Sequence, residues 1–352
     1  MIVGHGRSQS YDHRVPVVST AAGAVAGAVP ITDGIDAGLV WHYGDPLREG
    51  RRLEQGHGRV DLSTRSVLCV GGLDRLSWLH SLLTAHVESL DAHESATAFV
   101  LSPHGHIEYE LHLVDDGDRT WITTEPGSGE GLLAYLESMR FLLRVEVEDV
   151  SSDFVVVGEN RHEPTTTGPV WLSAPAYATP RESEDRYVPE RPAAWAVREL
   201  IVPRTDLATT LTDGAPPAGM WAWEALRVSA GVPRVGWETD HRTIPHEIGA
   251  IAAAVHLQKG CYRGQETVAR VHNLGRPPRR LVQLHLDGSA EHLPEHGSPV
   301  VLNERVVGRV TTAVRHYEWG PLALAIVKRN VPIDAVLDAD GVAASQTVIV
   351  AP

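Results

Sequence analysis

This chain of 352 residues contains only two cysteines and only two lysines. The cysteines are Cys69 and Cys261, and the lysines are Lys259 and Lys328. Two thiols cannot form a disulfide scaffold, and they cannot supply the four ligands of an all-cysteine metal or cluster site. Cys69 lies in an apolar run and is expected in the core. Lys259 and Cys261, one from each scarce type, are only two positions apart.

Positive charge is also in short supply. Lys and Arg together number 31 against 45 Asp and Glu, which leaves a net charge of −14 at pH 7. Nucleic acids and anionic membranes bind basic surfaces, so this balance argues against a general binder of either. The hydrophobic fraction of 43% is ordinary for a globular protein and too high for a disordered one. At about 150 residues per domain, the length predicts two or three domains.

Long apolar runs are missing as well. The longest uncharged stretch, residues 15–32, contains Pro16 and Pro30 and consists mostly of alanine and valine, so it is a poor membrane-spanning helix. The first fourteen residues carry charges and histidines, and no leucine-rich core of a signal peptide follows them. These absences, together with the scarcity of cysteine, predict a soluble cytoplasmic protein.

Three common catalytic motifs do not occur. They are the phosphate-binding G-x-x-x-x-G-K-[ST], the nucleophile elbow G-x-S-x-G and the zinc-binding H-E-x-x-H. The 19 histidines are dispersed, and we expect them at the surface or in the core rather than in a metal site. The chemistry of this chain must therefore come from other residue patterns.

Hydrophobic periodicity predicts an α+β unit in the first half of the chain. Residues 65–70 form a strand-like run, and after Asp74 leucines recur at three- and four-residue steps, as in an amphipathic helix that reaches Val87. A second helix is marked by Leu132 to Leu143. Further strands are expected at residues 107–114, 120–124, 145–150 and 154–157. The order strand, helix, strand, strand, helix, strand is typical of a ferredoxin-like α+β fold.

Shifts in composition divide the chain into four parts. Residues 1–37 are expected to form a flexible or loosely docked arm, and residues 38–158 an N-terminal α+β domain. Residues 159–278 are expected to form a second α+β domain, which begins with an extended connection and includes a helix at about residues 218–230. Residues 279–352 show only strand patterns and predict a small barrel or sandwich. The strands expected there are 281–286, 300–302, 306–314 and 322–327.

One segment combines a thiol, glycines and cations. It reads Lys-Gly-Cys-Tyr-Arg-Gly-Gln-Glu over residues 259–266. The glycines allow the backbone to approach a ligand closely, and Lys259 and Arg263 would favour the thiolate of Cys261 if they point toward it. The segment is therefore either a reactive-thiol site or a glycine-rich turn with an incidental cysteine.

Two further groups of residues could contact a ligand. On a predicted helix, Trp223, Glu224 and Arg227 share a face, which could hold a flat heterocycle or a carboxylate, or could be a surface ion pair over a packed indole. On a predicted strand, alternation puts Glu108 and Glu110 on the same face. One of them could act as a base near a ligand, or both could be exposed carboxylates.

The string K-G-C-Y-x-G-Q-E at residues 259–266 resembles the signature of the YgfZ-type folate-binding proteins, which are relatives of the aminomethyltransferase of the glycine cleavage system. The resemblance leaves out only residues 1–37 and 159–192. It implies a ring of ferredoxin-like α+β domains with a small C-terminal β-barrel, and tetrahydrofolate in or near a central hole. It also implies a role in the assembly or repair of iron–sulfur clusters, with indirect effects on tRNA modification. The other matching segments are residues 59–63, 79–84, 102–106, 225–233, 244–247 and 308–312.

The resemblance also implies roles for particular residues. By position, Cys261 is the functional thiol, and Arg227 is a folate-proximal arginine. Glu110 falls where the aminomethyltransferases have their catalytic aspartate, and its extra methylene group weakens the case for the same reaction. The residues expected to bind the cofactor or to build its loop are Trp223, Glu224, Arg227, Lys259, Tyr262, Gln265 and Glu266.

Three functions remain open at this point. The leading one is a tetrahydrofolate-binding protein that uses Cys261 together with iron–sulfur client or assembly proteins, because one thiol cannot hold a cluster alone. The second is a folate-dependent one-carbon transferase with Glu110 as general base. The third is an RNA-binding module around Arg276, Arg279 and Arg280, which the net charge opposes.

Overall fold

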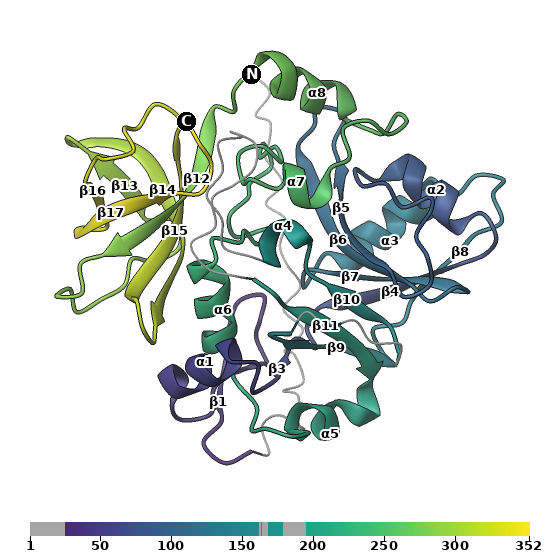
Figure 1. The fold of residues 1–352 in the computed structure, drawn as a ribbon, viewed down its shortest axis with the longest axis horizontal. Helices are drawn as coiled ribbons and strands as arrows, with labels where there is room; N and C mark the ends of the chain where they lie inside the picture. Colours follow the sequence, from purple (N-terminus) through teal and green to yellow (C-terminus); the bar gives the residue numbers. More distant parts are fainter. Residues whose placement is uncertain (1–24, 162, 164–167, 179–194) are drawn as a thin grey trace, which may run out of the picture.

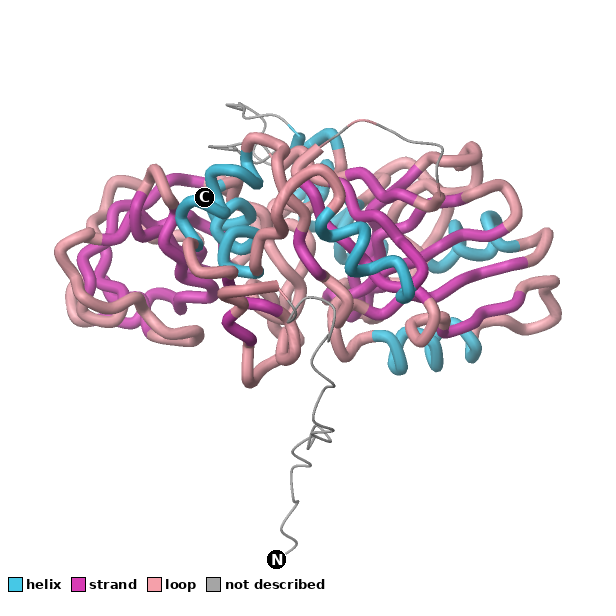
Figure 2. Tube along the Cα trace, turned by 90° about the horizontal axis from the view of Figure 1, so that it is seen from below, coloured by secondary structure: helices cyan, strands magenta, loops and turns pink. Residues whose placement is uncertain are grey.

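The computed structural model describes residues 25–161, 163, 168–178 and 195–352. The described residues contain a five-stranded sheet, a four-stranded sheet, a two-stranded ribbon and a closed barrel. Figure 1 shows the barrel on one side and the five-stranded sheet on the other, with helices α6 (Met220–Ser229) and α7 (Ile251–Ala254) between them. Seen from below, the body is elongated and the barrel forms one end (Figure 2). No helix in the described ranges is long and apolar enough to cross a membrane.

The five-stranded sheet contains the predicted ferredoxin-like pattern with one additional strand. Its order is β5-β6-β7-β4-β8, and all neighbouring strands are antiparallel. The edge strand β5 was not predicted, because its first residues, Ser-Ala-Thr-Ala, show no alternation of large apolar side chains. Helices α2 and α3 pack on this sheet through an apolar cluster. The bounds are β4 (Ser66–Gly71), α2 (Arg75–Leu82), β5 (Ser95–Leu101), β6 (Ile107–Asp115), β7 (Arg119–Thr124), α3 (Gly129–Ser138) and β8 (Glu146–Asp149).

Both helices of this unit are shorter than the leucine spacing predicts. Helix α2 ends at Leu82 because the backbone becomes extended at Leu83. Val87 therefore lies in the loop after the helix, where its side chain is buried. Helix α3 ends at Ser138, and Leu143 lies beyond it with its side chain exposed. Periodicity therefore identified the buried faces of these helices but not their ends.

The four-stranded sheet has the order β10-β11-β9-β3. Its strand β9 pairs with β11 along its whole length. The strand expected at residues 154–157 therefore belongs to this sheet and not to the first one, and the domain boundary expected at residue 158 falls inside a strand. The bounds are β3 (Val60–Asp61), β9 (Phe154–Glu159), β10 (Val170–Leu172) and β11 (Arg198–Pro203), followed by a 3-10 turn (Arg204–Asp206) and α5 (Leu207–Thr212). Helix α4 (Pro175–Ala178) follows β10.

The described part of the expected N-terminal arm is folded against the body. Strand β1 (Val29–Pro30) pairs with β2 (Val40–His42), and Asp36 accepts two hydrogen bonds from Arg234. This corrects the expectation of a flexible arm for residues 25–37, because the buried guanidinium of Arg234 requires that carboxylate. Residues 1–24 lie outside the described residues. Helix α1 (Pro46–Glu54) follows β2 and contacts α6.

The C-terminal region closes into a barrel, one of the two architectures expected for it. The strand order is β12-β15-β14-β13-β16-β17. The last two strands were not predicted, although the Asp340-Gly341 pair between them is a strong hairpin signal. The bounds are β12 (Arg279–Leu286), β13 (Pro299–Leu302), β14 (Arg305–His316), β15 (Gly320–Lys328), β16 (Leu337–Ala339) and β17 (Val342–Val348).

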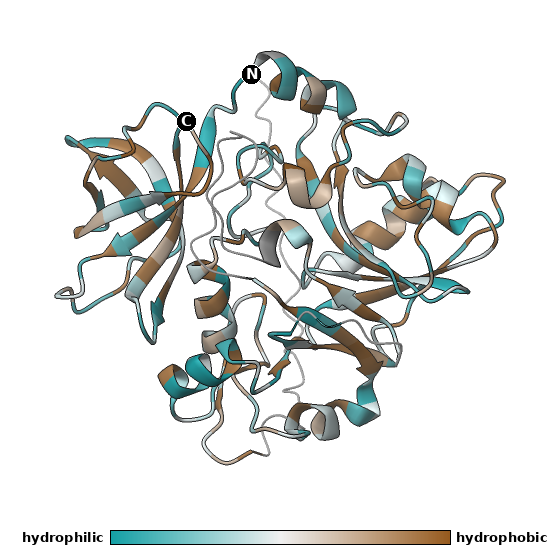
Figure 3. Ribbon diagram, in the orientation of Figure 1, coloured by the Kyte–Doolittle hydropathy of each residue, from teal (hydrophilic) through white to brown (hydrophobic). Residues whose placement is uncertain are grey.

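Helix α6 connects the barrel to the rest of the molecule. Its predicted extent of residues 218–230 is close to the observed one, and almost all of its side chains are buried. Gln283 of β12 donates hydrogen bonds to the carbonyl oxygens of Val228 and Ser229 at 2.7 and 3.0 Å, so the end of α6 is held by the barrel. Figure 3 shows apolar segments along α6, the sheets and the barrel, as expected for a helix buried between them.

Two glycine turns bring the thiol segment against the five-stranded sheet. Gly264 precedes helix α8 (Gln265–Leu274) with a φ of 81°, and a Cβ there would lie 2.5 Å from the carbonyl oxygen of Ser102. On the other side, a Cβ on Gly105 would lie 2.8 Å from the side chain of Thr267. The two turns therefore pack backbone against backbone, a contact that side chains at these positions would prevent.

We expect Gly264→Ala to destabilise the fold by about 1–3 kcal/mol, because alanine is strained at positive φ and its Cβ meets Ser102. Urea denaturation measures the loss. Gly260→Ala is the matched control in the same segment, since a Cβ there meets open space. Equal stability of the two variants would contradict the close contact.

Candidate functional site

A cavity lies where the two sheets and α6 meet, and we call it the central cavity. Strand β6 supplies Glu110 and His112, strand β10 supplies Trp171, and helix α6 supplies Trp223 and Arg227. The cavity is narrow, about 30 Å³, which is close to the room that one water molecule needs. Its wall is completed by Arg65, Thr97, Glu125, Trp195, Glu199, Val232, Pro233 and Arg234.

Three buried indoles form the apolar part of the wall. Trp195 packs edge-to-face on Trp223 with 4.9 Å between ring centroids, and the imidazole of His112 is stacked on Trp171 at 3.7 Å. Aromatic walls of this kind favour a planar ring as ligand. The sequence singled out Trp223, but Trp171 and Trp195 are distant from it along the chain, so no spacing indicated them.

Glu110 is the carboxylate that faces the central cavity without a partner. Among the described residues, no hydrogen bond or ion pair to its side chain is present, whereas Glu108 on the same strand pairs with Arg263 at 3.0 Å. Burial raises the pKa of Glu110 to about 7, although nearby His112 acts in the opposite direction. Of the two acids that the sequence placed on one strand face, Glu110 lines the cavity and Glu108 lies outside it.

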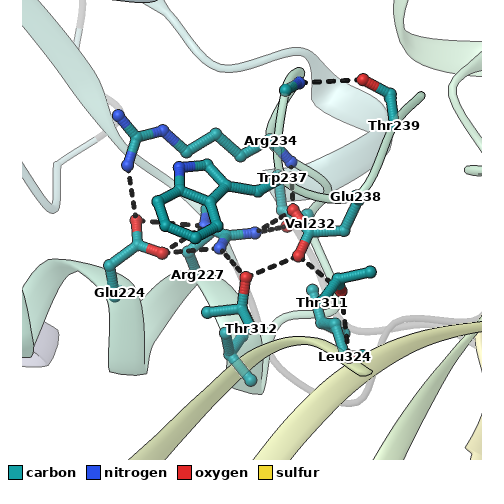
Figure 4. Close-up of polar contacts among 12 residues, drawn as sticks. Glu224, Arg227, Val232, Arg234, Trp237, Glu238, Thr239, Thr311, Thr312 and Leu324 are labelled. Carbon is teal, nitrogen blue, oxygen red and sulfur yellow. Dashed lines mark hydrogen bonds and ion pairs between the residues drawn. The ribbon is translucent and has the colours of Figure 1, made fainter. Parts of the chain in front are cut away.

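The predicted pair of Glu224 and Arg227 is buried, not on the surface. Arg227 donates to Glu224 at 2.6 Å, to Glu238 at 3.0 Å and to the hydroxyl of Thr312 at 3.0 Å (Figure 4). Burial by itself lowers the pKa of Arg227, but Glu224 and Glu238 outweigh it and raise the pKa above its usual range. Every direction from this guanidinium is thus occupied by protein groups.

Arg234 and Arg65 extend this network to the N-terminal segment and to both sheets. Arg234 binds Asp36 at 2.7 Å and Glu125 at 2.6 Å, and Arg65 binds Glu125 at 3.3 Å and Glu199. Three arginines therefore meet five carboxylates, an excess of negative charge that disfavours an anionic ligand group beside them. The five carboxylates are Asp36, Glu125, Glu199, Glu224 and Glu238.

A larger cavity of about 450 Å³ lies on the other side of the network, and we call it the outer cavity. Arg234 lies in the wall of both cavities. The outer cavity is bounded by the indoles of Trp41 and Trp237 and by Thr312 of the barrel.

The thiol of Cys261 is exposed, and the two flanking cations have other partners. Lys259 turns inward and donates to the carbonyl oxygens of Leu83 at 2.6 Å, of Ala85 at 3.0 Å and of His80, at the end of α2. Arg263 pairs with Glu108. The expected activation of the thiol by these two cations is therefore not what the structure shows.

The other residues of the segment 259–266 stabilise the turn that carries Cys261. Tyr262 is buried, which raises its pKa to about 12, and its ring lies 5.3 Å from the Lys259 nitrogen. Gln265 donates to the Lys259 carbonyl oxygen at 3.3 Å, and Glu266 is exposed in the first turn of α8. None of the described residues that line the central cavity comes from residues 259–266. The other cysteine, Cys69, is buried as predicted.

Two of the three arginines that suggested RNA binding are held in internal contacts. Arg279 pairs with Asp240 at 2.5 Å and with Glu247 at 2.8 Å, and Arg280 is fully buried. Arg263, the cation nearest to the thiol, is paired as well. Arg276 is exposed and donates to the Pro352 carbonyl oxygen, so the cluster exposes less positive charge than its sequence suggests. Within the described ranges, no group of three or more His, Cys, Asp or Glu residues is arranged to hold a metal ion.

No protein-family model matches the chain. The glycine cleavage system aminomethyltransferase T from Bartonella henselae superposes with a TM-score of 0.73 over 93% of this chain and 94% of that one, at 18% identity. The expected fold is thereby confirmed: the chain has the fold of the aminomethyltransferase superfamily.

Sequence relatives narrow this class. The tRNA-modifying protein YgfZ of Klebsiella pneumoniae is 28% identical over 77% of this chain and 85% of its own length, and that of Escherichia fergusonii is 36% identical over 38% and 43%. A chloroplastic protein of Arabidopsis thaliana named as a transferase is 25% identical over 72% of this chain, but the match spans only 61% of that relative. The chain is therefore similar in sequence to the YgfZ-type tRNA-modifying proteins and similar in fold to an aminomethyltransferase.

We expect Lys259→Met to lower the free energy of unfolding by about 2–3 kcal/mol, because three carbonyl oxygens at the end of α2 lose a charged donor. Lys328→Met is the control, since that lysine is exposed and makes one hydrogen bond, to Val306. Chemical denaturation compares them. Similar effects of the two changes would show that Lys259 does not anchor the segment.

Glu110→Gln tests the raised pKa. Between its ordinary pKa of 4.5 and about 7, Glu110 binds more protons in the folded than in the unfolded chain, so it makes stability fall as the pH rises through that range. Glutamine cannot ionise, so the variant should gain about 2 kcal/mol relative to wild type between pH 5 and pH 8. Urea denaturation at several pH values measures this, and Glu108→Gln should keep the wild-type profile.

Proposed function

We propose that this chain binds a reduced folate in the central cavity and assists the assembly or repair of iron–sulfur clusters, on which enzymes of tRNA modification depend. The observation that carries the proposal is the unpartnered carboxylate of Glu110 beside three buried indoles. The similarity to relatives named as tRNA-modifying proteins and the aminomethyltransferase fold also support this proposal.

The residues of the central cavity fit the ring of a folate. A pterin ring is planar and carries N–H donors along one edge, so it can stack on an indole while a carboxylate such as Glu110 accepts from that edge. The acid-rich network suits a neutral ring better than the carboxylates of the folate tail, which would lie outside the central cavity. When bound, a reduced folate supplies a carrier for one-carbon groups.

The size of the cavity adds a condition. A volume of about 30 Å³ holds little more than one water molecule, so a pterin ring enters only when side chains in the wall move. The outer cavity, which shares Arg234 with the central one, offers space for such a movement. We expect association to be slow for this reason.

Cys261 provides the chemistry toward sulfur or iron in this proposal. It is exposed, and its segment is held rigidly by Lys259 and by the contact between Gly105 and Gly264. A single thiol can supply only one ligand of an iron–sulfur cluster, so client or assembly proteins must supply the others. The exposed position suits such a transient contact.

A second function is favoured by one observation. A carboxyl group with a pKa of about 7 is well suited to general base catalysis near neutral pH. The chain could therefore carry out one-carbon transfer on folate, with Glu110 as the base. Incubation with tetrahydrofolate and one-carbon donors tests this, and absence of methylenetetrahydrofolate would rule it out.

Tryptophan fluorescence during titration with 5-formyltetrahydrofolate tests the folate site. We expect saturable quenching, because three indoles line the cavity, and about tenfold or weaker binding for Glu110→Gln, since a carboxylate acceptor is replaced by an uncharged amide oxygen. Glu108→Gln, on the same strand but outside the cavity, should bind like wild type. Equal affinities of the two variants would contradict the assignment of the site.

The thiol is tested in cells that lack the protein. We expect Cys261→Ala to fail to restore iron–sulfur enzyme activities, whereas Cys69→Ala, which removes the buried thiol, restores them. Full complementation by Cys261→Ala would exclude a role for this thiol.

A further inference from the structure

Several large apolar side chains are exposed together at one corner of the five-stranded sheet, and we call this group the apolar tip. Most of them lie in the turn after α3, which packs against the turn between β4 and α2. The exposed fractions reach 87% for Phe141 and 90% for Leu142. Apolar side chains that gather in one exposed patch mark an interaction surface, whereas single ones need no explanation. The members of the apolar tip are Leu73, Met139, Phe141, Leu142 and Leu143.

The apolar tip is held in position by hydrogen bonds to α2 and to the residue before it. The backbone N–H of Arg144 donates to the Asp74 carboxylate at 2.9 Å, and its guanidinium donates to the same group at 2.7 and 3.0 Å. The indole N–H of Trp78 donates to the carbonyl oxygen of Met139 at 3.0 Å. The tip is therefore a fixed shape, which lowers the entropy cost of binding to it.

The backbone at Phe141 is strained. Its φ is 26°, and bulky residues rarely adopt a positive φ. Burial of the ring does not offset this strain, because the ring is exposed. Strained residues of this kind cluster at functional sites, where the strain fixes the geometry that binding needs. The strain therefore indicates that Phe141 serves a contact outside its own fold.

A cavity of about 330 Å³ adjoins the apolar tip, and we call it the acidic cavity. Gly72, which directly precedes Leu73, lies in its wall. Arg119 is the only described residue of the wall with a positive charge, and it lies 3.8 Å from Glu148. The other two acids of the wall form no ion pair with any described residue. The three acids of the wall are Asp118, Glu146 and Glu148, and Cys69 and Gly71 complete it.

The charge of this corner determines which occupant fits it. A twofold dimer of this chain would bring the acidic cavities of both copies into one interface, where like charges repel. Anionic lipid headgroups are repelled for the same reason. A protein surface that carries lysine or arginine beside an apolar pocket complements both parts of the corner. Strand β8, which forms part of the acidic cavity, lies on the side of the molecule away from the barrel (Figure 1).

We propose that the apolar tip and the acidic cavity form a docking surface for a second protein, whose matching surface carries lysine or arginine beside an apolar pocket. The pocket covers Phe141 and Leu142, and the cation enters the acidic cavity next to Glu146. Burial of the tip stabilises the complex, and the acids steer the basic partner toward it. This surface shares no described residue with the central cavity, so the proposal does not depend on folate binding.

Two synthetic peptides probe this chemistry with the full chain. One is an amphipathic peptide of leucine and lysine, and in the other glutamate replaces lysine. We expect fluorescence anisotropy to show salt-sensitive binding of the lysine peptide, and at least about tenfold weaker binding of the glutamate peptide. Equal affinities for the two peptides would contradict the charge complementarity.

Variants of the two parts locate the binding. Phe141→Ser with Leu142→Ser removes the apolar tip, and Gly71→Leu fills the acidic cavity, because a Cβ at Gly71 meets nothing within 4 Å. Each should weaken binding of the lysine peptide about tenfold or more. Val336→Ser is the control, since Val336 is an apolar residue 67% exposed in the loop before β16, and it should bind like wild type. Unchanged affinity in the tip and cavity variants would overturn the proposal.

Phe141→Gly separates docking from folding. Glycine adopts a positive φ without strain, so the stability of this variant in urea should equal or exceed that of wild type. Its affinity for the lysine peptide should still fall, because the ring is lost. A loss of stability without a loss of affinity would show that Phe141 serves the fold, which contradicts the docking role.

The other two occupants are tested directly. Flotation with vesicles of phosphatidylcholine and phosphatidylserine tests a membrane, and analytical ultracentrifugation of the chain alone tests a second copy. We expect no vesicle binding and no dimer that Phe141→Ser with Leu142→Ser abolishes. Either result would assign the tip to that occupant and overturn the proposal. None of these measurements uses folate or iron–sulfur enzymes, so failure of the proposed function leaves them unaffected.

Discussion

The ion pairs of Arg227 are the interactions on which the rest of this structure depends. This guanidinium is buried between Glu224 of α6 and Glu238, and it also reaches Thr312 of the barrel. Removing one partner of such a pair leaves an uncompensated charge and costs several kcal/mol. Arg234 adds the N-terminal segment and the first sheet to the same network through Asp36 and Glu125. Four regions of the chain therefore meet around charges that cannot be left unpaired. Within the described residues, Glu110 is an acid beside this network that makes no ion pair.

This arrangement separates two kinds of chemistry. The central cavity lies inside, with its indoles and the Glu110 carboxyl group, and the thiol of Cys261 lies on the surface. Strand β6 links them, because it carries Glu110 toward the cavity and Glu108 to Arg263 in the thiol segment.

The sequence predicted the repetitive parts of the fold well and the site only in part. Alternation and leucine spacing located most strands and α6, because burial of one face leaves a periodic signal. The network left no such signal, since Arg234 binds Asp36 and Glu125 from positions 198 and 109 residues away. The orientation of the Lys259 side chain also could not be predicted. The sequence places Lys259 near Cys261, but its amino group donates to carbonyl oxygens at the end of α2. Spacing reports neighbours along the chain, and the site is built from contacts between distant segments.

A crystal structure of the protein with 5-formyltetrahydrofolate is the most direct test of the central claim. We expect density for the pterin ring against the indoles of the central cavity, with a ring N–H donor within hydrogen-bond distance of the Glu110 carboxyl group and with side chains of the cavity wall displaced. A pterin ring bound elsewhere, with Glu110 and the indoles unchanged, would contradict it.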